Sequence, residues 1–162
     1  MYKIYIETKR DKSSMDEMAQ INMLAEMVGK ELLKADNIIV YINGINVDRS
    51  ELSGLNLDAF VRLQDESNTK GPEVMVHELS KVSNGIGKEI YRELQKAYYD
   101  KNLNKGLIYV KEKFGVQDVP SVIINVISRL SQEDKNWLNT NMQAIARAIS
   151  DGIKTSFTLK QC

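Results

Sequence analysis

The run Pro120-Ser-Val-Ile-Ile-Asn-Val-Ile127 is the most continuous apolar stretch of the chain. A short run rich in Val and Ile is typical of a strand that is buried on both faces of a parallel sheet. Asn125 interrupts the run with an amide, and a buried amide without hydrogen-bond partners would cost about 1–3 kcal/mol. The stretch therefore predicts a central strand, in which Asn125 is either a structural tie or a residue of a cleft.

Other strand-like segments alternate with helical ones around this run. β-Branched and aromatic residues predict strands at 2–6, 37–42, 57–63, 73–79 and 107–110. Apolar spacings of three and four predict helices at 14–32, 80–99 and 131–157, the first opened by a capping box at 14–17 and the last with a break near 139–141. The alternation predicts an α/β fold, with a single domain over residues 1–162, a mostly parallel twisted sheet of about five or six strands, and helices on both faces.

The composition excludes several classes of function. The chain of 162 residues has 22 Lys+Arg and 22 Asp+Glu, and this zero net charge argues against nucleic acid or an anionic membrane as a partner. One His and one Cys exclude an internal disulfide, a zinc site of four Cys or His ligands, and a three-His catalytic site. A pair of a nucleophile and a histidine is possible only through His77.

The sequence also bears on location. No apolar run approaches the roughly 20 residues that a membrane helix needs, so we expect no membrane span. The N-terminus becomes charged at once and lacks the apolar region of a signal peptide. We therefore expect a cytoplasmic protein, with release by lysis or non-classical export as the alternatives.

Polar side chains follow the predicted strands at the edge where α/β folds bind ligands, beyond the carboxyl ends of the strands. Glu7 follows the first strand, and Asp65 and Glu66 follow the strand that ends near Leu63. These three carboxylates could form an acid/base pair or a site for Mg²⁺ or Ca²⁺. The alternative interpretation is that they are solvated loop charges.

His77 shares a strand face with Met75 and Leu79, which favours a partly buried structural histidine over a catalytic base. No glycine-flanked Ser or Cys elbow accompanies it. Gly85-Ile-Gly87 lacks a third glycine at dinucleotide spacing and lies within a predicted helix, so it does not indicate a phosphate loop.

Several segments follow one another in the order of a known family. Gly71-Pro-Glu-Val-Met-Val76 matches a Gly-x-Glu strand, Asn104-Lys-Gly106 a turn, Val119-Pro-Ser-Val-Ile-Ile-Asn125 a buried strand, and Asp58-Ala-Phe-Val-Arg-Leu-Gln64 an earlier strand. In this order, over nearly the whole chain, the sequence resembles the zinc-dependent N-acetylmuramoyl-L-alanine amidases, the autolysin-type cell-wall hydrolases. The resemblance implies an amidase-like α/β fold.

The chemistry of that family needs a zinc ion held by His, Glu and His, and a separate Glu as general acid/base. The resemblance places Arg10 at the first His, Met18 at the ligand Glu with Glu17 beside it, Gln64 at the second His and Asn125 at the catalytic Glu. Arg does not ligate zinc, and neither Gln nor Asn is a general base near pH 7. The resemblance therefore implies a fold that is kept, a catalytic centre that is lost, and no cofactor.

Three functions follow as hypotheses. The first is a catalytically inactive, amidase-like binding or regulatory module in a cell-wall, phage or sporulation setting, whose cleft binds an anionic peptide or glycan through Arg10, Gln64 and Asn125. Its partner would be a peptidoglycan fragment or another protein. The second is a structural or assembly subunit that uses an exposed apolar helix face. The third is a hydrolase with a relocated carboxylate site, for which the candidates are Glu7, Glu17, Asp65 and Glu66.

Overall fold

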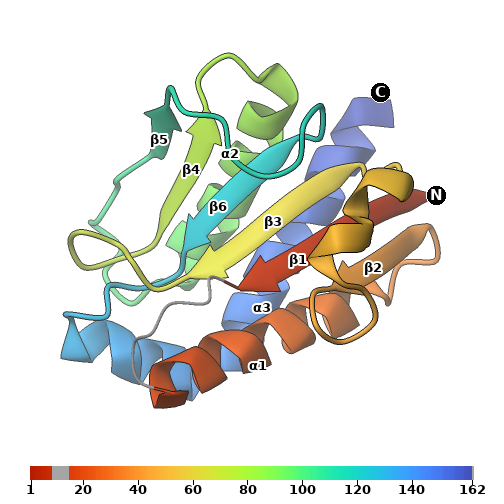
Figure 1. The fold of residues 1–162 in the computed structure, drawn as a ribbon. Coiled ribbons are helices and arrows are strands. Elements are labelled where there is room, and N and C mark those ends of the chain that lie inside the picture. Colours follow the sequence, from red (N-terminus) through yellow and green to blue (C-terminus); the bar gives the residue numbers. More distant parts are fainter. Residues whose placement is uncertain (9–14, 162) are drawn as a thin grey trace.

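Six strands form one sheet in the order β2-β1-β3-β6-β4-β5 (Figure 1). The computed structural model describes residues 1–8 and 15–161, with the backbone alone for residues 15–18 and 159–161. The strands are β1 (Tyr2–Thr8), β2 (Ile38–Ile42), β3 (Ala59–Gln64), β4 (Glu73–His77), β5 (Leu107–Val110) and β6 (Ser121–Asn125). Each strand predicted from the sequence is present within closely matching bounds.

The sheet is mostly parallel, as predicted. β1 pairs in parallel with β2 and β3, β3 with β6, and β4 with β5. The pairing of β4 with β6 is antiparallel, so β4 and β5 run against the other four strands. β6 lies between β3 and β4 and is buried along its whole length, which confirms the prediction of a central strand.

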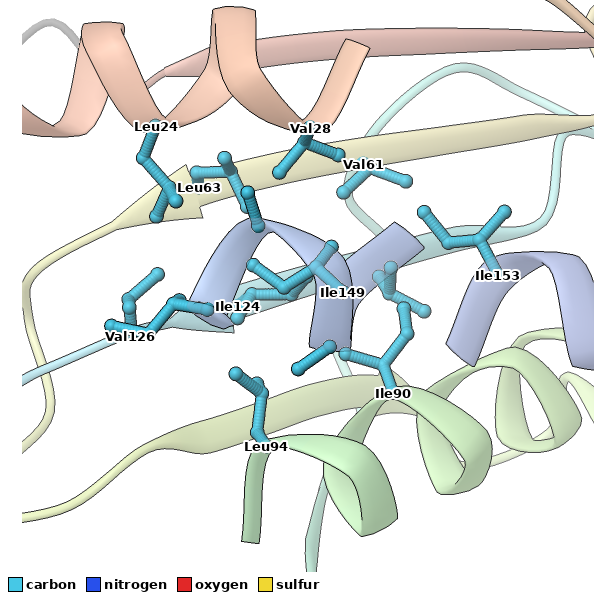
Figure 2. Packing of buried hydrophobic residues seen from close by; sticks show 14 of the residues in the cluster. Leu24, Val28, Val61, Leu63, Ile90, Leu94, Ile124, Val126, Ile149 and Ile153 are labelled. Atoms are coloured by element: carbon cyan, nitrogen blue, oxygen red, sulfur yellow. The ribbon is translucent and has the colours of Figure 1, made fainter. Parts of the chain in front are cut away.

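The three α-helices, α1 (Met15–Leu32), α2 (Lys81–Ala97) and α3 (Gln132–Gln161), pack on one face of the sheet. α3 contacts both α1 and α2. Figure 2 shows buried residues of the three helices meeting side chains from β3 and β6: Leu24, Val28, Ile90, Leu94, Ile149 and Ile153 against Val61, Leu63 and Ile124. The apolar stripe predicted for the first helix is therefore part of this core.

The opposite face carries a smaller cluster. The 3-10 helix η1 (Arg49–Gly54) contributes Leu52, which packs with Tyr5 and Phe60 of the sheet. Helices do lie on both faces, as predicted, but unequally, because within the described residues the opposite face holds the short 3-10 helix η1 and no α-helix. Alternation along the strands explains the division, since Ile4 and Ile6 face the α-helices while Tyr5 faces η1.

Two features of α3 bear on its packing. The helix is kinked at Asn141, which has non-helical angles (φ −124°, ψ 23°), and this confirms the predicted break. At Gly152 the helix meets α2 so closely that an added Cβ would lie 2.5 Å from Ile90 Cα. Glycine at this position lets the two helix backbones touch.

Candidate functional site

Gln64 and Asn125 lie side by side at the carboxyl ends of β3 and β6. They are direct partners in the parallel ladder, and Gln64 Nε2 donates a hydrogen bond of 2.7 Å to Asn125 Oδ1. Both side chains face away from the α-helices, and their residues are only 9% and 2% exposed. The two positions that the resemblance assigns to a zinc ligand and to the catalytic acid/base are therefore bonded to each other and buried.

An ion pair between Glu73, at the start of β4, and Lys105, just before β5, extends this group of polar side chains. Asn125 Nδ2 donates to Glu73 Oε2 at 3.4 Å, and Glu73 Oε1 lies 3.1 Å from Lys105 Nζ. Lys105 Nζ also lies within hydrogen-bond distance of Ser67 Oγ and of the Thr69 and Gly71 carbonyl oxygens, at 2.7, 2.7 and 3.1 Å. We call Gln64, Asn125, Glu73, Lys105 and Ser67 the amide network.

The amide network accounts for Asn125, which is a structural tie. Its amide has acceptor and donor partners in Gln64 and Glu73, as a buried amide requires. Sequence reasoning gave Glu73 and Lys105 no role, although both lie in quoted segments. The sequence did hold a signal for this pair. Glu73 is at the start of β4 and Lys105 lies just before β5, and the parallel pairing of the two strands brings these positions together.

The residues of the amide network do not fit zinc. Zinc in proteins is bound by thiolate, imidazole nitrogen or carboxylate oxygen, and Gln64 and Asn125 offer neutral amides whose facing atoms already bond each other. The one carboxylate of the network, Glu73, is paired with Lys105. No hydrolytic step through a metal can be built from these groups.

The remaining predicted positions are described in part or not at all. Arg10 lies outside the described residues. Glu17 and Met18 lie in the first turn of α1, where the backbone alone is described. Within residues 1–8 and 15–161, no group of three or more His, Cys, Asp or Glu side chains could hold a metal ion.

Glu7, the carboxylate at the end of β1, is held by two arginines. Arg62 Nε on β3 donates to Glu7 Oε2 at 2.7 Å, and Arg49 Nη1 at the start of η1 reaches both carboxylate oxygens at 3.1 and 3.2 Å. Tyr5 Oη donates to Glu7 Oε1 at 2.8 Å. Both guanidinium groups also lie over the ring of Phe60, at 5.9 and 5.6 Å from its centroid. Sequence reasoning missed both arginines, because nothing in local spacing places η1 over β1 and β3.

Burial and the hydrogen bond to Glu7 keep the Tyr5 hydroxyl protonated. Burial raises the pKa of the Tyr5 hydroxyl far above its usual value, and its hydrogen bond to Glu7 adds to the rise. Tyr5 therefore stays a donor, and Glu7, only 4% exposed, is an acceptor surrounded by donors. Both oxygens of the Glu7 carboxylate are therefore engaged by Tyr5, Arg49 and Arg62.

A cleft of about 540 Å³ opens beside this ion-pair group. Its wall is formed by Glu7, Arg49 and Arg62 together with Thr8, Asn43, Gly44 and Asp48. We call it the arginine cleft. Asp48 is the N-cap of η1, because its Oδ1 accepts the Ser50 backbone N–H at 3.2 Å. The cleft lies at the carboxyl ends of β1 and β3, where ligands bind in α/β folds.

Asp65 and Glu66 follow β3 in a turn that pairs with the segment after β6. The Arg129 backbone N–H donates to the Asp65 carbonyl oxygen at 3.1 Å, and Glu66 forms a bridge with Ser128. Among the described residues, their side chains and Glu7 do not form a group that could hold a metal ion.

His77 is bonded to the backbone on both sides of its ring. Its Nδ1 accepts the Leu79 N–H at 3.2 Å, so the other nitrogen, Nε2, carries the proton and donates to the Lys111 carbonyl oxygen at 3.0 Å. The residue is partly buried at the end of β4. This is the structural histidine that the sequence favours.

Comparison with known proteins identifies the fold. No protein-family model and no curated protein matches the sequence. Among solved structures, the CwlD amidase from Clostridioides difficile, in complex with the GerS lipoprotein, has a TM-score of 0.76 at 17% identity, covering 98% of this chain and 100% of that chain. The N-acetylmuramoyl-L-alanine amidase AmiC2 of Nostoc punctiforme has a TM-score of 0.79 at 15% identity, covering 97% of each chain. The catalytic domain of the amidase CwlV from Bacillus (Paenibacillus) polymyxa var. colistinus has a TM-score of 0.77 at 15% identity, covering 98% of this chain and 99% of that chain.

These likenesses confirm the predicted fold. The chain has the α/β fold of the N-acetylmuramoyl-L-alanine amidases from end to end, as the order of its sequence segments implied.

Proposed function

We propose that this protein is an amidase-fold protein without hydrolytic activity, which serves as a binding or regulatory module in peptidoglycan metabolism. The observation that carries the proposal is the amide network. Where the resemblance places a zinc ligand and the catalytic acid/base, Gln64 and Asn125 bond each other at 2.7 Å and are buried. Hydrolysis of an amide needs a polarised carbonyl and an activated water, and neutral amides supply neither.

The fold supports the peptidoglycan part of the proposal, because the similar structures are amidases that act on N-acetylmuramoyl-L-alanine. The CwlD structure shows a similar fold bound to a lipoprotein, so we keep a protein partner as the alternative to a peptidoglycan fragment. We propose a cytoplasmic location for the protein, with release by lysis or non-classical export as the alternatives. None of the helices within residues 15–161 combines the length and the apolar character needed to cross a bilayer.

The alternative of a relocated carboxylate site has less support. Its candidates were Glu7, Glu17, Asp65 and Glu66, and of these Glu7 is in ion pairs with Arg49 and Arg62.

The test is release of peptides from purified peptidoglycan. The protein is incubated with peptidoglycan sacculi, with added Zn²⁺ and separately with a chelator, and soluble peptides are measured by liquid chromatography. An active amidase run in parallel shows that the substrate is competent. We expect no release above the buffer control in either condition. Release that the chelator abolishes would overturn the proposal.

A further inference from the structure

The two guanidinium groups of the arginine cleft have more donors than Glu7 can accept. Glu7 takes the Nε–H of Arg62 and the Nη1 group of Arg49. Within the described part of the chain, Nη1 and Nη2 of Arg62 and Nε and Nη2 of Arg49 have no hydrogen-bond acceptor. The Arg62 side chain is 19% exposed, and none of its described nitrogens is both buried and without a partner, so its unused donors open onto the cleft. Donors that face a cleft in this way can bond an acceptor on a ligand.

The two arginines are also held in place. Glu7 is fixed by Tyr5, and each guanidinium rests over the Phe60 ring. Because Arg62 bonds Glu7 through Nε, its two terminal nitrogens form a free edge, and such an edge matches the two oxygens of a carboxylate. Holding the donors in position lowers the entropy cost of binding.

The charges around the cleft limit the kind of anion. The formal charges of Arg49 and Arg62 balance those of Glu7 and Asp48, and both carboxylates already accept hydrogen bonds. A polyanion would meet these two carboxylates without a surplus of positive charge, whereas a ligand with one carboxylate needs only the unused donors. The neutral rim at Thr8, Asn43 and Gly44 suits the rest of a small polar ligand.

We propose that the arginine cleft binds the carboxylate of a short peptide, with the Arg62 edge as the main contact and Arg49 as the second. This inference names a ligand class for the binding role and rests on the proposed function in that respect. It does not involve Gln64 or Asn125, because the buried amide network has already used their facing groups.

The probe is N-acetyl-alanyl-alanine, titrated into the whole protein by calorimetry or by amide chemical shifts. The same dipeptide with a C-terminal amide is the matched control, and inorganic phosphate tests the preference for one carboxylate. We expect the acid to bind in the millimolar range or tighter, and the amide and phosphate to bind roughly tenfold more weakly or not at all. Equal binding of acid and amide, tighter binding of phosphate, or no binding of the acid would overturn the proposal.

Variants of the two arginines test whether the ligand binds in the arginine cleft. Arg62→Lys keeps a positive charge beside Glu7 but removes the two-donor edge, and we expect roughly tenfold weaker binding of the acid. Arg49→Gln leaves Glu7 paired with Arg62 and should weaken binding severalfold. Arg92→Gln, on an exposed arginine of α2, is the control and should leave binding unchanged.

A further variant separates binding from folding. Glu7→Gln keeps one acceptor oxygen to hold Arg62 but removes the competing negative charge, so it should tighten binding of the acid severalfold, the reverse of what general damage would do. Circular dichroism checks the fold of every variant, and Arg49→Gln decides the question if Arg62→Lys does not fold. Unchanged binding in Arg49→Gln, or weaker binding in Glu7→Gln with the fold intact, would overturn the proposal. These binding readouts are independent of peptide release, so the two proposals fail in different experiments.

Discussion

Asn125 is adapted to its neighbour Glu73, and this makes the catalytic residue of the amidases hard to restore. The two residues are partners across the antiparallel pair of β4 and β6, and Glu73 forms an ion pair with Lys105. Asn125→Glu would place a second buried carboxylate beside the first. We expect a loss of about 2–4 kcal/mol in the free energy of unfolding, measured with denaturant.

A second substitution tests that cause. In Glu73→Gln combined with Asn125→Glu, one carboxylate again faces Lys105, so most of the lost stability should return. Asn102→Glu, at an exposed position, serves as the control and should stay within about 0.5 kcal/mol of the parent. The explanation is wrong if the double variant is no more stable than the single one.

At the residue scale, the sequence predicts where residues lie in the fold better than which residues they contact. The resemblance assigned Gln64 and Asn125 to the same site, and the two residues are neighbours at the carboxyl ends of β3 and β6. The structural role of Asn125 depends on its hydrogen bond to Glu73. Glu73 is in reach because β4 pairs with β6 in the antiparallel direction. The arginines around Glu7 come from η1 and β3, which lie 42 and 55 residues from Glu7 in the sequence, and no periodicity links them to it.

At the scale of elements, the close approach of α2 and α3 depends on Gly152. A Cβ there would lie 2.5 Å from Ile90 Cα and 2.7 Å from Ile90 N, and backbone atoms cannot move aside alone. Gly152→Ala should therefore separate the helices and destabilise the protein by about 1–3 kcal/mol. Gly85→Ala in α2 is the matched comparison, because nothing lies within 4 Å of its Cβ position, and it should stabilise by about 0.5–1 kcal/mol. Thermal unfolding of both variants checks the pair, and equal effects would contradict it.

The elements themselves were predictable because each has a strong local pattern. Apolar spacing predicted the three helices, and runs of β-branched and aromatic residues predicted the six strands; the predicted break near 139–141 is the kink at Asn141. Direction and layering were not predictable in the same way. A period of two is the same for a strand running either way, so the reversal of β4 and β5 left no mark on the sequence. The placement of all three α-helices on one face depends on packing between helices far apart in the chain.

At the scale of the whole molecule, buried tyrosines predict that the protein loses folding stability at alkaline pH. Tyr98 is 1% exposed and donates to Asp134, a fully buried residue of α3 that also accepts the Gly71 and Ser128 backbone N–H groups. Burial first, and then the hydrogen bond to Asp134, raises the pKa of Tyr98, and burial likewise raises that of Tyr5. Since the unfolded tyrosines lose their protons near pH 10, the stability that these groups contribute is complete below about pH 10 and declines above it.

Denaturant unfolding between neutral pH and about pH 12 measures this decline. Tyr98→Phe removes both the hydroxyl and its bond to Asp134, so it should cost about 1–2 kcal/mol at pH 7. Its disadvantage should shrink as the pH rises above 10, because phenylalanine has no proton to lose. A constant difference between the two proteins across this range would contradict the prediction.

The central place of β6 has a consequence for synthesis on the ribosome. Among the strands of the described residues, β6 comes last in the sequence, yet it joins β3 to β4 in the middle of the sheet. Until residues 121–125 emerge, the strands can form only two separate pieces, β2-β1-β3 and β4-β5, each with an open edge. Open edges of this kind pair readily with other chains. Until β6 pairs with both pieces, the nascent chain therefore carries open sheet edges at β3 and β4, which the folded protein covers.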